Sequence, residues 1–126
     1  MYTQAMSTRD IMLNKTGEIL IPKAKWCDTY FTRMRGFTFT KPVQEKQGLV
    51  LVNGRDSRVD SSITMFFVNY DLGVIWVNSA GRVVDTLVAK SWRPSYASKD
   101  PARYVIEGHP SILEKVEIGD LITFVQ

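Results

Sequence analysis

The segment from residue 61 to residue 85 constrains the fold most, because it places three short strand-forming runs around two turns. Its first run, 63–68, is apolar and ends at a polar step, after which the second run occupies 72–77. The turn 78–81, Asn-Ser-Ala-Gly, then leads into the third run. Runs rich in β-branched and aromatic residues, bounded by Asn, Ser and Gly, are typical of strands joined by tight connections. We therefore expect a tight hairpin at 78–81, with Gly81 at a positive φ angle.

Similar runs recur through the rest of the chain, at 49–52, 83–88, 104–107 and 121–125. Near the N-terminus, alternating apolar residues flank the turn sequence Asn-Lys-Thr-Gly at 14–17, which predicts a further hairpin that ends at Pro22. Many short strands with little helix between them favour antiparallel pairing, and closing the sheet on itself covers its edges.

Between Pro22 and Gly36 the apolar spacing becomes that of a helix. Apolar residues at i, i+3, i+4 and i+7 would form one stripe, made of Cys27, Tyr30, Phe31 and Met34. Asp28 near the start, with Arg33 and Arg35 near the end, would suit the helix dipole, and the glycine could take a left-handed cap. We expect this stripe to face the sheet, which would leave the Cys27 thiol buried and unreactive.

The fold class that follows is mainly β: a single antiparallel barrel-like sandwich with one amphipathic helix packed against it. A short second helix is expected at 111–115, capped by Ser111. The length of 126 residues fits one domain over 1–126, in which residues 1–8 carry no periodicity and are expected to form a loose arm.

Composition excludes several classes of protein. A single cysteine cannot form an internal disulfide, which suits a reducing compartment. A secretory signal would need an apolar core within the first twenty residues, and charged residues interrupt that stretch. No apolar run approaches the ~20 residues that a membrane-spanning helix needs. We expect a cytoplasmic chain without a membrane span. Its net charge of +3 is too small to be typical of a dedicated nucleic-acid-binding protein.

Six short motifs occur in a fixed order along the chain: Arg33-Met34-Arg35-Gly36, then residues 48–51, 62–68, 81–84 and 105–107, and finally Gly119-Asp120. In this order they resemble the DUF192 family of small bacterial and archaeal proteins of unknown function, over nearly the whole chain. The resemblance implies a compact, mainly β domain with a helix against it, and it implies no established reaction.

Two positions depart from the pattern of that family. Many members have a histidine where this chain has Thr64, and an aspartate where it has Gly73. The resemblance therefore implies that a polar site built on that imidazole and carboxylate is absent here. Either these positions serve packing alone, or this chain has lost an activity.

Nucleophilic and metal-dependent chemistry find little support in the sequence. Cys27 and His109 are the sole thiol and imidazole, and no Gly-x-Ser-x-Gly turn is present to expose a serine nucleophile. Asp56, Asp60 and Asp71 could supply oxygen ligands, but no EF-hand pattern surrounds them. No Gly-x-Gly phosphate loop occurs. We expect no metal and no cofactor.

Carboxylates offer the one catalytic alternative. Asp85, Glu107 and Asp120 each lie in or beside a predicted strand and could meet across a closed sheet as general acid and base. They also have structural roles available, since Asp120 suits a turn after Gly119 and Glu107 could pair with Arg82.

The loop 90–103 is the most suggestive surface. It combines cations with aromatic rings, a mixture that can contact an anion while stacking on its body, at Lys90, Trp92, Arg93, Tyr96, Lys99 and Arg103. The alternative is that its rings pin the loop to the sheet while its cations are solvated. The expected partner is an anionic small molecule or a polyanion, whereas nucleic acid is not favoured.

Three functions remain open on this reading. The first is a non-enzymatic binding or accessory domain for an anionic or extended ligand, with its groove beside the loop 90–103. The second is a small hydrolase-like enzyme that uses the carboxylates, and the third is a protein-interaction module that uses the exposed face of the helix. The sequence names no ligand, substrate or oligomeric state.

Overall fold

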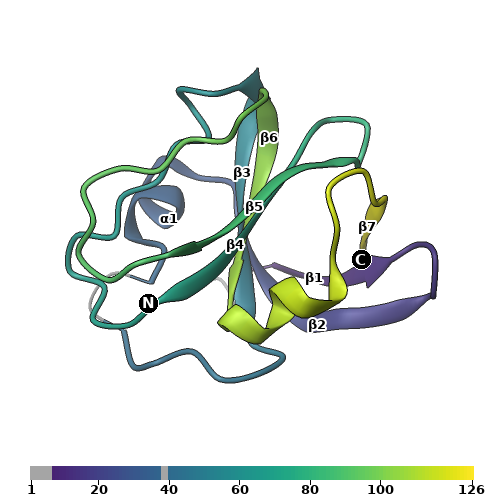
Figure 1. Ribbon diagram of the computed structural model, residues 1–126, viewed down its shortest axis with the longest axis horizontal. Helices are drawn as coiled ribbons and strands as arrows, with labels where there is room; N and C mark the ends of the chain where they lie inside the picture. The colour runs from purple at the N-terminus through teal and green to yellow at the C-terminus, as the bar shows by residue number, and fades with distance from the viewer. Residues whose placement is uncertain (1–6, 38–39) are drawn as a thin grey trace, which may run out of the picture.

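A computed structural model describes residues 7–37 and 40–126, and these residues form one curled sheet with two short helices (Figure 1). The strands are β1 (Thr8–Leu13), β2 (Glu18–Cys27), β3 (Gly48–Ser57), β4 (Leu72–Val77), β5 (Val83–Ala89), β6 (Ala102–Gly108) and β7 (Ile122–Val125). The helices are α1 (Tyr30–Arg35) and the 3-10 helix η1 (Pro110–Lys115). The strand order is β5-β4-β6-β3-β2-β1-β7. The mainly β, barrel-like fold class predicted from the sequence is confirmed.

One strand pair corrects the expectation of antiparallel pairing throughout. β2 runs parallel to β3, with Lys25 opposite Leu49 and Cys27 opposite Leu51. The reason lies in the connection, because residues 28–47 carry α1 and return the chain to a point beside Lys25, from which β3 runs in the same direction as the end of β2. A crossover of this length is what a parallel pair requires.

The two edges of the sheet meet at one end. The N–H of Val83, at the start of β5, donates to Asp120 O at 2.8 Å, and the N–H of Ile122, at the start of β7, donates to Gly81 O at 2.8 Å. Gly81 has a φ of +84°, which confirms the expected hairpin geometry at 78–81. The sheet is therefore a half-barrel that backbone hydrogen bonds close where β5 and β7 begin.

Apolar residues cover both faces of the sheet and form two clusters. Side chains alternate along a strand, so in β4 Val74 and Trp76 belong to one cluster while Ile75 and Val77 belong to the other. The cluster that contains Ile75 extends to β1, β2, β7 and η1. The cluster that contains Trp76 lies beneath the segment 58–71 and the loop 90–101. The candidate site lies on this second face.

The helix differs most from its prediction. β2 continues through Pro22 to Cys27, so the cysteine belongs to a strand and the helix has six residues, capped by the Thr29 side chain. The predicted buried stripe is wrong, since the exposed fractions of Tyr30, Phe31 and Met34 are 67%, 79% and 63%. The physical reason is that β2 gains ladder hydrogen bonds from β1 and then from β3, and these hold its last residues extended.

The run 63–68, expected to be a strand, is another correction. Ile63 makes a single bridge to Tyr96, and the chain then turns at Phe67, whose φ is +63°. The N–H of Met65 donates to Arg93 O at 2.9 Å, and the Trp92 N–H donates to Met65 O at 3.0 Å. The segment therefore pairs with the loop 90–101, outside the main sheet.

The second helix and the N-terminal arm also differ in detail. η1 is a 3-10 helix that begins at Pro110, and its cap is His109, whose ring nitrogen accepts from the Ser111 N–H at 3.1 Å, in place of the expected Ser111 cap. Of the expected arm, residues 1–6 lie outside the described residues, while Ser7 O accepts from Trp26 N and Thr8 begins β1. None of the helices in the described ranges is long and apolar enough to cross a membrane.

Candidate functional site

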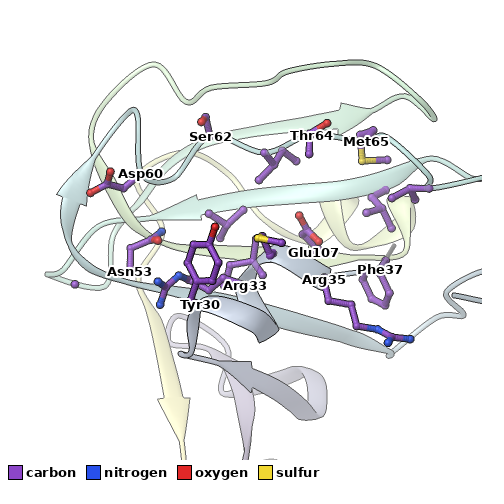
Figure 2. A pocket seen from close by; sticks show the side chains of 18 residues that line it. Tyr30, Arg33, Arg35, Phe37, Asn53, Asp60, Ser62, Thr64, Met65 and Glu107 are labelled. Atoms are coloured by element: carbon purple, nitrogen blue, oxygen red, sulfur yellow. The ribbon is translucent and has the colours of Figure 1, made fainter. Parts of the chain in front are cut away.

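A cavity of about 510 Å³ lies between α1, the second face of the sheet and the segment 58–71 (Figure 2). We call it the α1 cavity. Helix α1 and the two residues after it form one wall, strands β3, β4 and β6 form the floor, and residues 60–68 form the opposite wall. Pockets that hold small organic ligands typically measure about 300 to 1,000 Å³. The α1 cavity therefore has the size of a small-molecule site.

Half of its lining residues are apolar or aromatic. The strands contribute the floor because alternation turns every second side chain of β3, β4 and β6 to this face. The apolar and aromatic lining residues are Tyr30, Met34, Phe37, Leu51, Ile63, Met65, Val68, Leu72 and Val105. A ligand body that fills this space would leave water for an apolar surface with two aromatic rings.

Two polar side chains belong to the strands of the floor: Asn53 of β3, whose amide donates to Arg103 O at 3.2 Å, and Glu107 of β6. Glu107 lies in the middle of the sheet, opposite Leu49 of β3 and Val74 of β4, and its exposed fraction is 5%. Figure 2 shows its carboxyl group directed into the cavity. A Cβ built on Gly36 would lie 3.4 Å from its Oε1, so the end of α1 passes directly beside the carboxyl group.

The carboxyl group of Glu107 has an unusual acidity. Burial raises its pKa from 4.5 to about 7, because the charged form is poorly solvated there. No hydrogen bond or ion pair joins it to any other residue within 7–37 and 40–126. The suggested partner Arg82 instead donates to Gly119 O at 2.7 Å, so that pairing is wrong.

Two further titratable groups lie close enough to be influenced by Glu107. Burial, and then the charge of Glu107, raise the pKa of the Cys27 thiol to about 11. Burial raises the pKa of Tyr70 as well, against the opposing effect of a hydrogen bond with Thr40, and Glu107 adds to the increase. The expected burial of Cys27 is confirmed, and it results from the position of the residue at the end of β2.

Polar groups surround the mouth of the cavity. Arg33 donates to Asp28 O at 3.0 Å and to Val52 O at 3.2 Å, which ties α1 to β3. Asp60 pairs with Arg55 at 3.1 Å. The remaining polar lining residues are Arg35, Asn53, Ser62 and Thr64. The mouth thus offers both charges and several hydrogen-bonding groups to the outer part of a ligand.

The three candidate carboxylates do not come together. Asp85 is buried and accepts from the N–H groups of Thr86 and Lys99, both at 2.9 Å. Asp120 accepts from the Glu117 N–H, which lowers its pKa, and pairs with Lys15 at 3.1 Å. Of the three, Glu107 alone lines the α1 cavity.

The predicted loop surface lies elsewhere, and most of its side chains have partners. Lys90 pairs with Asp71 at 3.3 Å, and the Trp92 Nε1–H donates to Asn69 at 2.8 Å. The hydroxyl of Tyr96 accepts from the Lys90 N–H at 2.9 Å. Arg103, which belongs to β6, donates to Asn53 O at 2.9 Å. These contacts hold the loop 90–101 on the sheet and on the segment 58–71.

Arg93 and Lys99 differ from the other loop cations. Both are exposed, and the side chain of neither hydrogen-bonds or pairs with a residue in the described part of the chain. No residue of the loop lines the α1 cavity. Anion binding by this loop stays a prediction.

The remaining sequence candidates have local structural roles. His109 caps η1, Asp56 accepts from the N–H and hydroxyl of Ser79, and Asp71 accepts from the Ser91 N–H. Asp60 pairs with Arg55, as described above. Within the described ranges, no three His, Cys, Asp or Glu residues gather as a metal site would require.

The two positions that depart from the family pattern face different sides of the sheet. Thr64 lines the α1 cavity. A Cβ on Gly73 would lie 2.9 Å from His109 O and 3.1 Å from the Cα of Pro110, on the face that carries η1. Glycine allows the chain before η1 to pass close to β4, so packing explains this position.

Sequence reasoning missed the α1 side of the cavity. The helical period predicts a helix packed flat on the sheet, whereas four residues of α1 line the cavity: Tyr30, Arg33, Met34 and Arg35. No sequence motif marks Asn53 as a lining residue. A signal was present, because Glu107 interrupts the apolar run of a central strand at 104–107, where a structural charge is rarely placed.

Comparisons with known proteins agree with this fold. The family model DUF192, described as "Uncharacterized ACR", matches residues 11–124. A UPF0127 protein of Thermococcus kodakarensis is 39% identical over 117 residues, which cover 90% of this chain and 73% of that protein. A UPF0127 protein of Pyrococcus furiosus is 36% identical over 112 residues, which cover 86% of this chain and 93% of that protein.

Two crystal structures are similar in fold. A protein of unknown function from Novosphingobium aromaticivorans has a TM-score of 0.73 at 15% identity, covering 80% of this chain and 74% of its own. A protein proposed to be a transcription regulator, from Sinorhizobium meliloti, has a TM-score of 0.75 at 14% identity, covering 98% of this chain and 97% of its own. At these identities the likeness concerns the fold alone.

Proposed function

This chain belongs to the DUF192 family, whose description assigns no reaction, and we propose that it is a non-enzymatic domain that binds a small or extended organic ligand in the α1 cavity. One observation carries the proposal. The cavity has the size of a small-molecule site, and its apolar floor residues surround a buried carboxyl group, Glu107, that is directed inward, while further polar groups lie around the mouth. A few polar groups among apolar walls is the usual composition of a small-molecule site.

A hydrolase-like role has less support from the geometry. General acid and base catalysis by paired carboxylates needs both groups within reach of one substrate. Asp85 and Asp120 hold backbone N–H groups away from the cavity, and Asp60 at the mouth pairs with Arg55. In the described lining, the carboxylate that accompanies Glu107 is thus Asp60, and Arg55 already pairs with it.

A thermal-shift screen against a library of small organic molecules tests the proposal, because a ligand of the folded state raises the melting temperature. Thr64→Trp should weaken the binding of the compounds found, since Thr64 lines the cavity and a larger side chain there would narrow its wall. Ser95→Trp is the matched control, because Ser95 is exposed and does not line the cavity. Compounds that bind the Thr64→Trp variant as tightly as the wild type would contradict the proposal.

A second candidate site is the loop surface, for an anionic ligand. It is supported by Arg93 and Lys99, which are the loop cations whose side chains contact no other described residue by hydrogen bond or ion pair. This site is separate from the α1 cavity, so variants of one should not affect binding at the other.

A further inference from the structure

Among the described residues, Glu107 has no partner that explains its place in the fold. A carboxylate removed from water destabilises a protein unless hydrogen bonds or an opposite charge compensate it. The described residues supply neither, and the residues opposite Glu107 in the sheet are Leu49 and Val74, which are apolar. The carboxyl group therefore has no hydrogen-bond donor among the described residues, and it opens onto the cavity, where a ligand can supply one (Figure 2).

The walls around the carboxyl group suit the body of an organic cation. The rings of Tyr30 and Phe37 and the sulfur of Met65 line the same space. Aromatic faces attract ammonium and guanidinium groups, and apolar side chains cover the methylene or ring portion of such a molecule.

We propose that Glu107 makes the α1 cavity selective for small organic cations, in which a primary ammonium or guanidinium group is attached to an apolar body. This inference rests on the proposed function and names its ligand class. The cation would donate charge-assisted hydrogen bonds to the Glu107 carboxylate, the kind that contributes most when both groups leave water.

The charged groups around the cavity are compatible with a cationic ligand. The titratable or charged residues that line the cavity with Glu107 are Tyr30, Arg33 and Arg35 from α1 and Asp60 from the opposite wall. Cys27 of β2 and Tyr70 of the segment 58–71 are close enough for Glu107 to raise their pKa values. Arg33 donates to two backbone oxygens, and Figure 2 shows the Arg35 guanidinium directed away from Glu107. An anionic ligand would instead place its charge beside the carboxylate.

The acidity of Glu107 gives this inference a pH signature. The cation needs the ionised carboxylate, and with a pKa of about 7 the ionised fraction increases about tenfold between pH 6 and pH 8. Cys27 and Tyr70 have raised pKa values, so both stay neutral in that range. The affinity for a cation should therefore be about tenfold higher at pH 8 than at pH 6.

Benzylamine, benzyl alcohol and benzoate form a matched set of probes, because they share a ring and differ in charge. We suggest NMR titrations of the ¹⁵N-labelled chain at pH 6 and pH 8, following the amides of α1 and β6. Benzylamine should bind most tightly, with the tenfold pH dependence, while benzyl alcohol should bind more weakly. Glu107→Gln should weaken benzylamine binding by about tenfold or more, the size expected for a lost charge-assisted hydrogen bond, and should remove the pH dependence.

The outcomes separate this inference from the proposed function. If benzyl alcohol or benzoate binds as tightly as benzylamine, or if benzylamine binds equally at both pH values, the cavity still binds ligands and the cation selectivity is wrong. If benzylamine does not bind at all, the inference also fails, while the library screen with Thr64→Trp decides the proposed function. The wild-type pH dependence tests the inference even if the Glu107→Gln variant does not fold.

Discussion

At the scale of single residues, Glu107 should lower the stability of the fold while it favours the binding of a ligand. Its neighbours along and across the strands are apolar, so its carboxyl group loses water on folding without gaining a partner in the described structure. Residues at binding sites often carry such a penalty because the ligand relieves it. Because a pKa that differs between the folded and unfolded states makes stability depend on pH, the raised pKa of Glu107 allows this cost in folding free energy to be measured.

The stability of the chain should therefore fall as pH rises above about 5. The folded state holds the Glu107 proton up to about pH 7, whereas the unfolded chain releases it near 4.5, so the folded state binds more protons in between. The contribution is fully present below 4.5 and is lost as pH rises through 7, which corresponds to about 2 to 3 kcal/mol between pH 5 and pH 8.

Urea denaturation of the wild type and of Glu107→Gln at both pH values measures this effect. The amide does not titrate, so the variant should gain about 2 to 3 kcal/mol relative to the wild type on going from pH 5 to pH 8. The comparison cancels the contributions of Asp71 and Asp120, whose lowered pKa values act at lower pH. A constant difference between the two proteins would mean that the carboxyl group is well solvated.

At the scale of elements, the sequence predicted strands far better than the helix. The expected runs 72–77, 83–88, 104–107 and 121–125 all fall on strands, because β-branched residues there are buried against a sheet. Cys27 and Met34 matched a helical period by coincidence, since the ladder hydrogen bonds of β2 extend the strand past the point where the pattern changes. Pairing with a strand distant in sequence leaves no signal in a local pattern.

The hairpin at 78–81 is an element whose closure can be tested. Gly81 has a positive φ, and a Cβ built there would lie 2.9 Å from Ile122 O. Ile122 begins β7, the edge strand that meets the start of β5. Gly81→Val should therefore destabilise the fold by about 1 to 3 kcal/mol through backbone strain and the steric contact. Gly17→Val is the matched control, because Gly17 has a φ of +73° with nothing within 4 Å of a Cβ.

Thermal unfolding of the two glycine variants separates strain from contact. Both should melt below the wild type, and Gly81→Val should melt lower than Gly17→Val. Equal melting temperatures would show that the contact with Ile122 adds nothing, and a wild-type melting temperature for Gly81→Val would overturn the assigned turn geometry.

At the scale of the whole molecule, the sequence predicted one of the cavity's groups and missed the cavity itself. Glu107 is a candidate in the sequence because it lies in a predicted strand, from which its carboxylate could meet others across a closed sheet. The α1 cavity forms between the short helix α1 and the sheet, and the hydrogen bond from Arg33 to Val52 O of β3 helps to hold the helix in place. The distance between a helix and a sheet depends on tertiary packing, which a local sequence pattern does not show. The charges of the loop 90–101 and of Arg103 can be read directly from the sequence. The partners of Lys90 and Arg103 cannot, because Asp71 and Asn53 are distant from them in sequence.

The loop prediction can now be narrowed to two of its cations. Arg93→Ala with Lys99→Ala should leave the melting temperature almost unchanged, because exposed cations without partners add little to stability. If the loop binds anions, the same double variant should weaken the binding of inorganic polyphosphate by roughly 1 to 3 kcal/mol, and the wild-type affinity should fall with salt. Fluorescence anisotropy with labelled polyphosphate measures both effects.

Lys90→Ala with Arg103→Ala is the matched control, since it removes the same charge from side chains that have partners. Lys90 pairs with Asp71, and Arg103 donates to Asn53 O and stacks on Tyr104, so this variant should melt at a lower temperature than the wild type. If both double variants weaken polyphosphate binding equally, net charge accounts for the binding and the loop has no specific site. If neither does, the anion-binding role of the loop is wrong, and the α1 cavity remains as the site to which a ligand should be sought.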